Sequence, residues 1–474
     1  MDTYKLMENM PPSSRRKFLK LSGLAGAASM LPACQAVGSL GATASGAPAK
    51  SVIFLVVDGL CNGTVGLAHH WKLRNEQTPL NWVKLFEREG LTRAYQDTAS
   101  ASSPVTDSAA AASAWGSGKR VNNGSINFDP AGNSLKPIFS YAKEAGKATG
   151  LVTTCRVTHA TPAGFTANVA KRAMEDEIAL QYLEREVDVL LGGGARHFAQ
   201  QQEDGSVIDQ IPRFKDKGYE VVTNVDELSS AKGHGPLLGL FSKSHIPYAI
   251  DRKNDRSHRD VPGLADMFRA ALDRLDGSKD GFLLQVESGR VDHAGHGNDP
   301  AGILHEFLEF DACIPIALEY IDAHPDTMLV VTTDHGTGGC QLDGAGAGYV
   351  DSGPALERIN QFKYSFEWLQ QRFSVTGKFD PLPVKMAFGI DATEAQAAIV
   401  QKALDEEAQY LSGALGEAFG KQIKELTAVG WTSSKHTSEC VELFAFGPGS
   451  QAIPPFVKNY QIFGFVTSAL GIKA

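Results

Sequence analysis

The chain has 474 residues, with 45 Lys+Arg against 54 Asp+Glu, and therefore a formal charge of −9 at pH 7. Apolar residues make up 43% and charged residues 21%, which excludes a disordered chain, a coiled coil or a collagen. The acidic balance argues against nucleic acid as an obligate partner, because phosphate backbones are bound by clusters of Lys and Arg. Six Cys are too few for a disulfide framework. No apolar run behind the N-terminal segment is long enough to span a membrane.

Residues 1–44 are predicted to be a leader and linker, followed by a catalytic domain over residues 45–474. Residues 14–20 read Ser-Arg-Arg-Lys-Phe-Leu-Lys, a twin-arginine pattern, and a short apolar stretch follows them. This pattern predicts export through the twin-arginine pathway to the periplasm. Cleavage before Cys34, in a sequence similar to a lipobox, would give a membrane-anchored lipoprotein, whereas cleavage after Ala44 would not. Both sites stay open at this point.

The rest of the chain predicts an α/β fold. Short apolar runs alternate with amphipathic helical stretches, which is typical of a mostly parallel central sheet with helices on both faces. Strands that are covered on both faces are rich in β-branched residues and Leu and lack alternation. The runs of this kind are residues 52–57, 151–154, 187–191, 282–286 and 328–332.

Helices are expected between these strands. Thr78 and the Pro that follows it predict the start of a helix that ends near Gly90. An apolar stripe at helical spacing predicts another over residues 264–275, and residues 393–417 read as a further helix. The segment 341–430 matches no motif and is expected to be an insertion, with an irregular, Gly- and Pro-rich first part up to residue 390. In relatives such insertions decorate the entrance of the site or a dimer interface.

Metal-ligand side chains follow four of the predicted strands. In open α/β sheets, ligands bind outside the carboxyl ends of the strands. One such segment alone fits an ordinary turn, but four at one edge predict a metal site. Imidazole with carboxylate suits zinc, whereas Asp, Thr and Glu oxygens suit magnesium. Taken strand by strand, the candidates are Asp58; His159 and Thr161; Glu287, Asp292, His293 and His296; and Asp334 and His335.

The candidate nucleophile is Ser108. Asp107 and Ser108 precede an Ala-rich stretch, so Ser108 is expected at a helix N-terminus, where free N–H groups and the helix dipole favour an anion. Either residue could simply cap the helix. A neighbouring metal site favours the nucleophile, because a serine without a nearby base needs a cation to form its alkoxide at moderate pH.

Together these motifs resemble those of the alkaline phosphatases, which are metal-dependent phosphomonoesterases. They follow the family's chain order from about residue 51 to residue 440. The motifs are Val-Val-Asp58-Gly, Thr106-Asp107-Ser108-Ala-Ala, His159-Ala-Thr161-Pro-Ala-Gly with Arg172, Val286-Glu287-Ser-Gly-Arg-Val-Asp292-His-Ala-Gly-His296, Thr333-Asp334-His335-Gly and His436-Thr.

The resemblance implies a centre with two zinc ions and one magnesium ion, with cobalt as a substitute for zinc. The implied ligands are Asp292, His296 and His436 for one zinc, Asp334, His335, Asp58 and the Ser108 oxygen for the other, and Asp58, Thr161 and Glu287 for magnesium. His159 and His293 would lie behind these ligands and tune magnesium affinity and phosphate release.

The resemblance also implies the reaction, the hydrolysis of small phosphate monoesters. Ser108 would attack phosphorus, and the resulting phosphoserine would then be hydrolysed. Arg172 would bind two phosphate oxygens, with Asp107 orienting its guanidinium.

Other functions were weighed against this one. A phosphodiesterase, sulfatase or phosphomutase of the same broader superfamily is the alternative enzyme. However, the residues after Ser108 lack the Pro and Arg of a sulfatase motif, and phosphodiesterases commonly use Thr. A non-catalytic metal- or phosphate-binding protein would need neither Ser108 nor Arg172. Cys61 and Cys155, near strand ends, are soft ligands or, more simply, small buried residues. The oligomeric state, including a homodimer, stays open.

Overall fold

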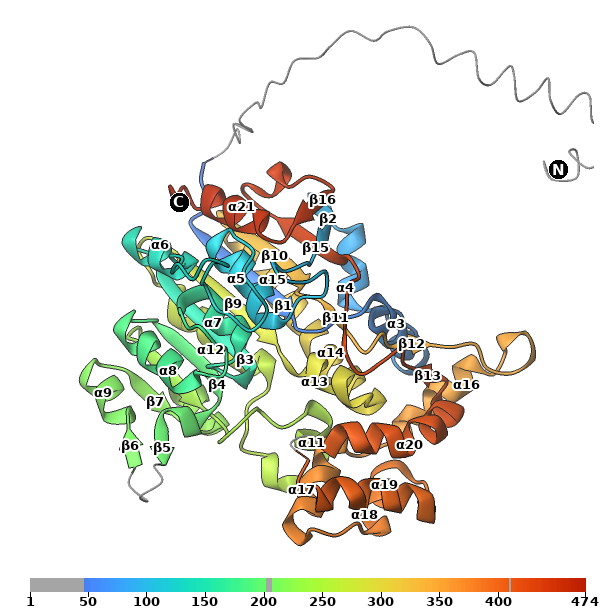
Figure 1. Cartoon of the computed structure of the whole chain (residues 1–474). Coiled ribbons are helices and arrows are strands. Elements are labelled where there is room, and N and C mark those ends of the chain that lie inside the picture. Colours follow the sequence, from blue (N-terminus) through green and yellow to red (C-terminus); the bar gives the residue numbers. More distant parts are fainter. Residues whose placement is uncertain (1–46, 202–206, 409–410) are drawn as a thin grey trace, which may run out of the picture. The chain divides into compact units, whose positions relative to one another are not determined.

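The computed structural model describes residues 47–201, 207–408 and 411–474 and is built around a ten-stranded sheet (Figure 1). The strand order is β16-β2-β15-β10-β1-β9-β3-β4-β8-β7. All neighbours from β10 to β7 are parallel, whereas β15 is antiparallel to both β10 and β2. The prediction of a mostly parallel sheet is therefore confirmed, and the antiparallel part lies toward one end.

The predicted strands occupy the middle of this sheet. They are β1 (Ser51–Val57), β3 (Ala148–Arg156), β4 (Val189–Gly193), β9 (Phe282–Ser288) and β10 (Thr327–Thr333). Every residue of β1, β9 and β10 is buried, which explains why their sequences are continuous rather than alternating. The strands that the sequence did not reveal all lie toward the two ends of the sheet: β2 (Thr92–Asp97), β7 (Glu220–Val222), β8 (Leu237–Leu240), β15 (Val441–Phe446) and β16 (Phe456–Lys458).

Successive residues of β1 point to opposite faces and join two separate apolar cores. Ile53, Leu55 and Val57 belong to one core, and Phe54 and Val56 to the other. Helices on one face are α3 (Asn62–Asn75), α12 (Leu264–Leu275), α14 (Pro300–Asp311) and α15 (Cys313–Ala323). Helices on the other face are α5 (Ser108–Ser117), α6 (Ile138–Glu144), α7 (Ala160–Thr166), α8 (Glu175–Glu184) and α21 (Gln461–Ala469).

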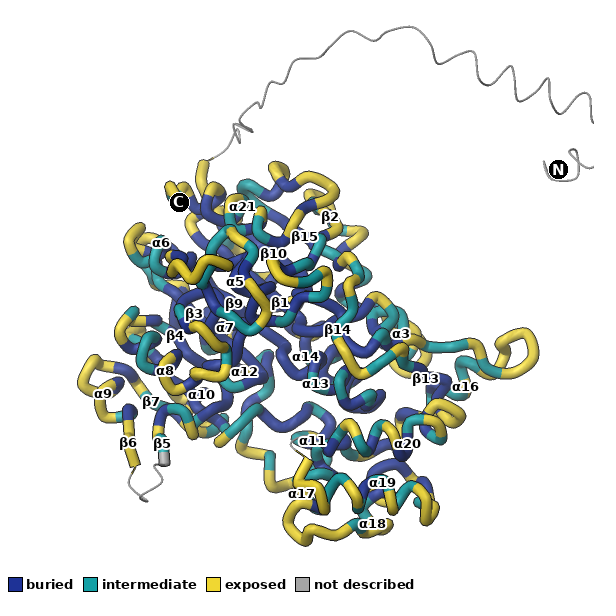
Figure 2. Tube along the Cα trace, viewed as in Figure 1, coloured by how far each residue is buried: buried dark blue, intermediate teal, exposed yellow. Residues whose placement is uncertain are grey.

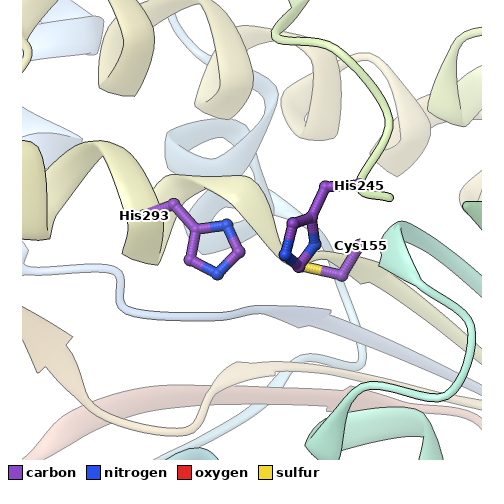
Figure 3. A group of neighbouring side chains, drawn as sticks. All are labelled: Cys155, His245 and His293. Carbon is purple, nitrogen blue, oxygen red and sulfur yellow. The ribbon is translucent and has the colours of Figure 1, made fainter. Parts of the chain in front are cut away.

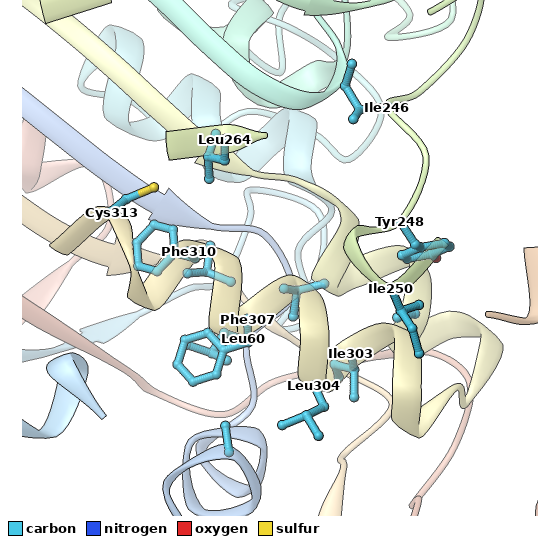
Figure 4. Packing of buried hydrophobic residues seen from close by; sticks show 14 of the residues in the cluster. Leu60, Ile246, Tyr248, Ile250, Leu264, Ile303, Leu304, Phe307, Phe310 and Cys313 are labelled. Atoms are coloured by element: carbon cyan, nitrogen blue, oxygen red, sulfur yellow. The ribbon is translucent and has the colours of Figure 1, made fainter. Parts of the chain in front are cut away.

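Both cores are well filled. The predicted helix over residues 264–275 is confirmed as α12, and its apolar stripe is buried. Figure 4 shows Phe307 of α14 beside Leu60, which lies just beyond β1, and Phe310 of the same helix belongs to the same buried cluster. Figure 2 shows the sheet as the buried centre, with exposed residues on the outer helices. None of the helices in the described part of the chain is long and apolar enough to cross a membrane.

The helix expected from Thr78 has different bounds. It begins at Asn81 as α4 (Asn81–Lys84) and continues as the 3-10 turn η1 (Leu85–Glu87). The cap comes from elsewhere in the chain, because the Asp311 carboxylate accepts from the backbone N–H groups of Asn81 and Trp82 at 3.0 and 2.8 Å. A distant carboxylate, which local sequence cannot show, therefore replaces Thr78.

The insertion is helical rather than irregular. It contains α16 (Ser352–Glu357), α17 (Phe366–Thr376), α18 (Pro381–Phe388), α19 (Glu394–Asp405) and α20 (Leu411–Thr427). The single helix expected over 393–417 corresponds instead to α19 and the first part of α20, two helices that pack on each other. The helices of the first part have six to eleven residues, too few turns for a clear apolar period.

The remaining elements connect the sheet to its surroundings. The helices are α9 (Ile211–Asp216), α10 (Val225–Ser230), α11 (Ala249–Asn254) and α13 (Arg290–Gly297). Three two-stranded sheets pair β5 (Ala199–Gln201) with β6 (Val207–Asp209), β11 (Gly336–Thr337) with β14 (His436–Thr437), and β12 (Gln341–Leu342) with β13 (Val429–Gly430).

Candidate metal centre

The predicted ligands gather at the carboxyl end of the central strands. Val57, the last residue of β1, pairs with Thr333 of β10 and with Ser288 of β9, so the residues at these strand ends are neighbours. We call this set the rim: Asp58, Glu287, Asp292, His296, Asp334, His335 and His436. Rim residues, together with His159, form three overlapping groups in which potential ligand atoms lie within 4.8 Å of one another. These groups are Asp292, His335 and His436; Asp58, Asp334 and His335; and Asp58, His159 and Glu287.

In the first pocket of the rim, two imidazoles face each other. His296 Nδ1 lies 2.8 Å from the carbonyl oxygen of Ser434, and His436 Nδ1 lies 2.8 Å from that of Thr106. Carbonyl oxygens only accept, so each Nδ1 carries a proton, and either ring presents a lone pair at Nε2 when it is neutral. The two Nε2 atoms are 3.0 Å apart, and Asp292 Oδ1 lies 3.5 and 3.4 Å from them. This arrangement requires a proton or a metal ion between the groups.

The electrostatics of this pocket favour positive charge. Burial by itself would lower the pKa of His436, but the hydrogen bond and charge of Asp292 raise it to about 9. Burial would raise the pKa of Asp292, yet the charges of His296 and His436 hold it well below its usual range. A zinc ion at this position would supply positive charge in place of the proton, with ligands that suit it.

The second pocket joins the ends of β1 and β10. His335 Nε2 lies 3.1 Å from Asp334 Oδ2 and 3.7 Å from Asp58 Oδ1. Neither oxygen of Asp58 has a hydrogen-bond partner among the described residues, although both are buried. Gly59 has a φ of +77°, and a Cβ there would lie 2.6 Å from the Asp292 Cα, so only glycine permits this close approach. A buried carboxylate without donors is costly and fits a metal ligand.

The third pocket is rich in oxygen. Thr153 Oγ1 donates to Glu287 Oε2, while Glu287 Oε1 has no partner within the described residues. Thr161 Oγ1, near the start of α7, is also buried without a partner there. Asp58, His159 and Glu287 complete the group. Carboxylate and hydroxyl oxygens are the ligands that magnesium prefers.

Like charges accumulate across the rim. Burial raises the pKa of Asp58 well above its usual value, and the charges of Asp334 and Asp292 add to the effect. Burial also raises the pKa of Glu287 and of Asp334 to about 7. Bound divalent cations would offset this repulsion and favour the ionised carboxylates. The residues present therefore fit a centre with several metal ions.

Ser108 lies beside the second pocket. The predicted helix N-terminus is confirmed, since α5 begins at Ser108 with Asp107 as its N-cap. Asp107 Oδ1 accepts from the N–H of Ala110 at 2.9 Å, so the cap leaves the Ser108 hydroxyl free. Ser108 Oγ is buried and lies 3.4 Å from His335 Nε2.

Arg172 connects Asp107 with His159. Its Nη1 donates to Asp107 Oδ2 at 3.1 Å, and its Nη2 donates to His159 Nε2 at 3.0 Å. Burial and the charge of Arg172 lower the pKa of His159 well below its usual value, so the ring is a neutral acceptor. His159 therefore has a contact that the sequence did not suggest: it holds the arginine from the side opposite Asp107.

Several residues of the site were missed by the sequence reasoning. Thr337 Oγ1 donates to Asp292 Oδ1 at 2.5 Å, and Thr153 donates to Glu287. His245 lies beside His293, with 4.5 Å between the ring centroids. His245 follows the parallel strand β8, as the other candidate ligands follow their strands. The sequence did not reveal β8, which has only four residues, and so did not indicate His245.

Comparisons with known proteins identify the family of the chain. The family model described as alkaline phosphatase matches residues 49–472. Alkaline phosphatase 3 of Bacillus subtilis is 31% identical over 429 residues, which cover 89% of each chain. Streptomycin-6-phosphate phosphatase of Streptomyces griseus is 34% identical over 334 residues, covering 61% of this chain and 74% of that one.

Solved structures show the same fold. The crystal structure of the alkaline phosphatase from Thermus thermophilus superposes with a TM-score of 0.83 at 33% identity, covering 94% of this chain and 96% of that one. The cold-active enzyme from Shewanella superposes with a TM-score of 0.73 at 30% identity, covering 89% and 99%. The chain therefore belongs to the alkaline phosphatase family, whose members are metal-dependent phosphomonoester hydrolases.

Proposed function

We propose that this protein hydrolyses small phosphate monoesters through a phosphoserine on Ser108, with two zinc ions and one magnesium ion at the rim. The observation that carries the proposal is the position of Ser108 Oγ, 3.4 Å from His335 Nε2. The same nitrogen lies 3.7 Å from Asp58, a buried carboxylate with no donor among the described residues. The nearest imidazole, that of His335, would itself be a metal ligand in this proposal, so Ser108 would depend on bound cations for activation.

Each ion has a ligand set of fitting chemistry. Asp292, His296 and His436 would hold one zinc, Asp58, Asp334, His335 and Ser108 the other, and Asp58, Thr161 and Glu287 the magnesium. Bound there, the metals would lower the pKa of the Ser108 hydroxyl and stabilise negative charge on the leaving oxygen. Cobalt would substitute for zinc, because the same imidazole and carboxylate ligands accept it.

The protein's own groups would then bind and orient the phosphate. Asp107 and His159 each take one N–H of the Arg172 guanidinium, which leaves one N–H on each terminal nitrogen for a phosphate oxygen. Ser108, at the N-terminus of α5, would attack phosphorus in line as the ester oxygen departs with the alcohol. Water then hydrolyses the phosphoserine and regenerates the serine hydroxyl.

An activity panel tests this function. Purified protein should release phosphate from an aryl phosphate monoester at alkaline pH, and a chelator should abolish the activity. A phosphodiester and a sulfate ester, assayed on the same sample with its metal content measured, test the alternative enzymes of the superfamily. A higher rate on the diester than on the monoester would overturn the proposal in favour of a phosphodiesterase.

We propose in addition that the protein is exported through the twin-arginine pathway. The support is the N-terminal sequence alone, since residues 1–46 lie outside the described part of the chain. Replacing Arg15 and Arg16 by Lys should retain the protein in the cytoplasm, as cell fractionation would show. Cys34→Ala should release a lipid-anchored protein from the membrane and leave a protein that is cut after Ala44 unchanged. Sedimentation of the purified protein tests for a homodimer.

A further inference from the structure

A second group of metal-ligand side chains lies next to the rim. Cys155 near the end of β3, His245 between β8 and α11, and His293 on α13 each offer a ligand atom, and these atoms lie within 4.8 Å of one another. Figure 3 shows the two imidazoles and the thiol side by side on three different segments of the chain. Cys155 and His245 belong to none of the ligand sets proposed above.

The packing holds these side chains in place. Cys155 is buried against Gly289, the residue that precedes α13, where a Cβ would lie only 2.6 Å from Sγ. His245 and His293 are half-buried, with 4.5 Å between their ring centroids, so one side of the group remains accessible. Three fixed protein ligands and one open side are the usual pattern of a four-coordinate metal site that keeps a water.

The ligand types limit the choice of ion. Thiolate and imidazole are soft to intermediate ligands that bind zinc and cobalt well and magnesium and calcium poorly. Charges of both signs surround Cys155: the carboxylates of Glu287 and Asp58, and the guanidinium groups of Arg290 and Arg156. Charge alone therefore does not select a cation here. Binding must come from the metal–sulfur bond, and we expect it to be weaker than binding at the carboxylate-rich rim.

One contact has to give way on binding. Arg156 Nη1 contacts His245 Nε2, and the Arg156 backbone N–H points to His245 Nδ1 at 3.3 Å. The guanidinium only donates, and both ring nitrogens therefore face donors, which a neutral imidazole with its own N–H cannot fully satisfy. A metal ion on Nε2 would replace the guanidinium contact, while Glu175 continues to hold Arg156 through Nε and Nη2.

We propose that Cys155, His245 and His293 form a fourth metal site, which takes a soft divalent ion such as zinc or cobalt and is separate from the three ions of the rim. On binding, the thiol proton leaves to solvent and a metal–sulfur bond forms, with no change of oxidation state. The site does not depend on the proposed phosphatase chemistry, because neither Cys155 nor His245 contacts Ser108 or Arg172 within the described structure.

Cobalt spectroscopy tests the proposal directly. Protein stripped of metal and reloaded with excess Co²⁺ should show a thiolate-to-cobalt charge-transfer band in the near ultraviolet, which the oxygen and nitrogen ligands of the rim cannot produce. Elemental analysis should find one more cobalt per chain in the unmodified protein than in Cys155→Ala. The matched control is Cys313→Ala, which removes another buried thiol, located in α15, and should change neither the band nor the stoichiometry.

Each outcome decides the question. Absence of the band from the cobalt-loaded unmodified protein overturns the fourth site, whatever the variants do. Retention of the band in Cys155→Ala assigns it to another thiol and also overturns the proposal. His245→Ala keeps the thiol of Cys155 but should bind one cobalt fewer per chain than the unmodified protein. If this variant binds as much cobalt as the unmodified protein, the three-ligand site is wrong. A protein that shows the band but no phosphatase activity would keep the fourth site and lose the proposed function, so the two failures are distinguishable.

Discussion

The rim and the insertion (residues 341–430) differ in almost every physical respect. The rim is buried and highly charged, and short sequence motifs at strand ends place its residues. The insertion is largely helical. Near its start it has an exposed tip, where Tyr349 is 74% and Val350 73% exposed. The difference shows that the positions of the rim residues depend on the parallel sheet, whereas the insertion lies outside that sheet and bears on the rim where the two are in contact.

The two regions meet at α13, the helix that carries Asp292 and His296. Arg290, in the first turn of α13, is only 1% exposed and forms an ion pair with Glu367 of α17. Its guanidinium also lies 4.0 Å from the ring centroid of Tyr248. The insertion therefore does more than decorate an entrance: through Arg290 it holds the helix that bears two of the proposed zinc ligands.

The largest expected effect is at the rim. Ser108→Ala should lower kcat by at least about 10³-fold, because it removes the nucleophile. The variant should retain the metal content of the unmodified protein, since the other ligands remain, and both quantities can be measured on one preparation. Full activity in this variant would rule out the covalent mechanism.

The next largest effect is expected where the insertion contacts α13, at the ion pair between Arg290 and Glu367. Glu367→Gln leaves Arg290 buried without a counter-charge and should lower the free energy of unfolding by about 2–3 kcal/mol, less than for a fully buried pair because Glu367 is partly exposed. Urea unfolding measures the change. Glu357→Gln is the control: Glu357 also lies in the insertion, and its ion pair with Arg74 of α3 is exposed. This substitution should lower the free energy of unfolding by less than about 0.5 kcal/mol. Equal costs would show that Arg290 does not anchor the insertion.

A smaller, pH-dependent effect is expected at Asp251, which contacts the start of α17. Burial raises the pKa of Asp251 to about 7, while Ser365, at the start of α17, donates to its carboxylate. Between its ordinary pKa of 3.8 and about 7, the native state binds the proton more tightly than the unfolded state does. Stability conferred by the protonated form is therefore present at low pH and is lost as the pH rises to 7.

The variant Asp251→Asn isolates this contribution. The unmodified protein should lose about 1–2 kcal/mol more unfolding free energy between pH 5 and pH 7 than the variant loses. Urea titrations of both proteins at the two pH values measure the difference. Parallel loss in the two proteins would mean that Asp251 ionises normally.

The smallest effect is expected at the exposed tip. Replacing Tyr349 and Val350 by Ser should change the free energy of unfolding by less than about 0.5 kcal/mol per site and leave kcat unchanged. Thermal unfolding and the standard phosphatase assay check both points. A loss of activity would show that the tip reaches the substrate and would remove the contrast between insertion and rim.

The site was easier to predict than the outer parts of the fold. Asp58 could be placed because the run before it has the continuous apolar character of a fully buried parallel strand. Ser108 could be placed because Asp107 and the Ala-rich stretch after it signal a helix start. The bounds of α4 could not be predicted, since its cap is the distant Asp311, and α16 to α18 are too short to show a period.

The sequence by itself determined the central strands and the metal-ligand residue types at their ends, because both follow from local pattern. Only the tertiary structure decided which of these residues are neighbours. Cys155, His245 and His293 lie on segments far apart in the chain, and nothing local to any of them indicates the others. They meet because strand order and register bring the carboxyl end of β3, the loop after β8 and α13 to the same edge of the sheet.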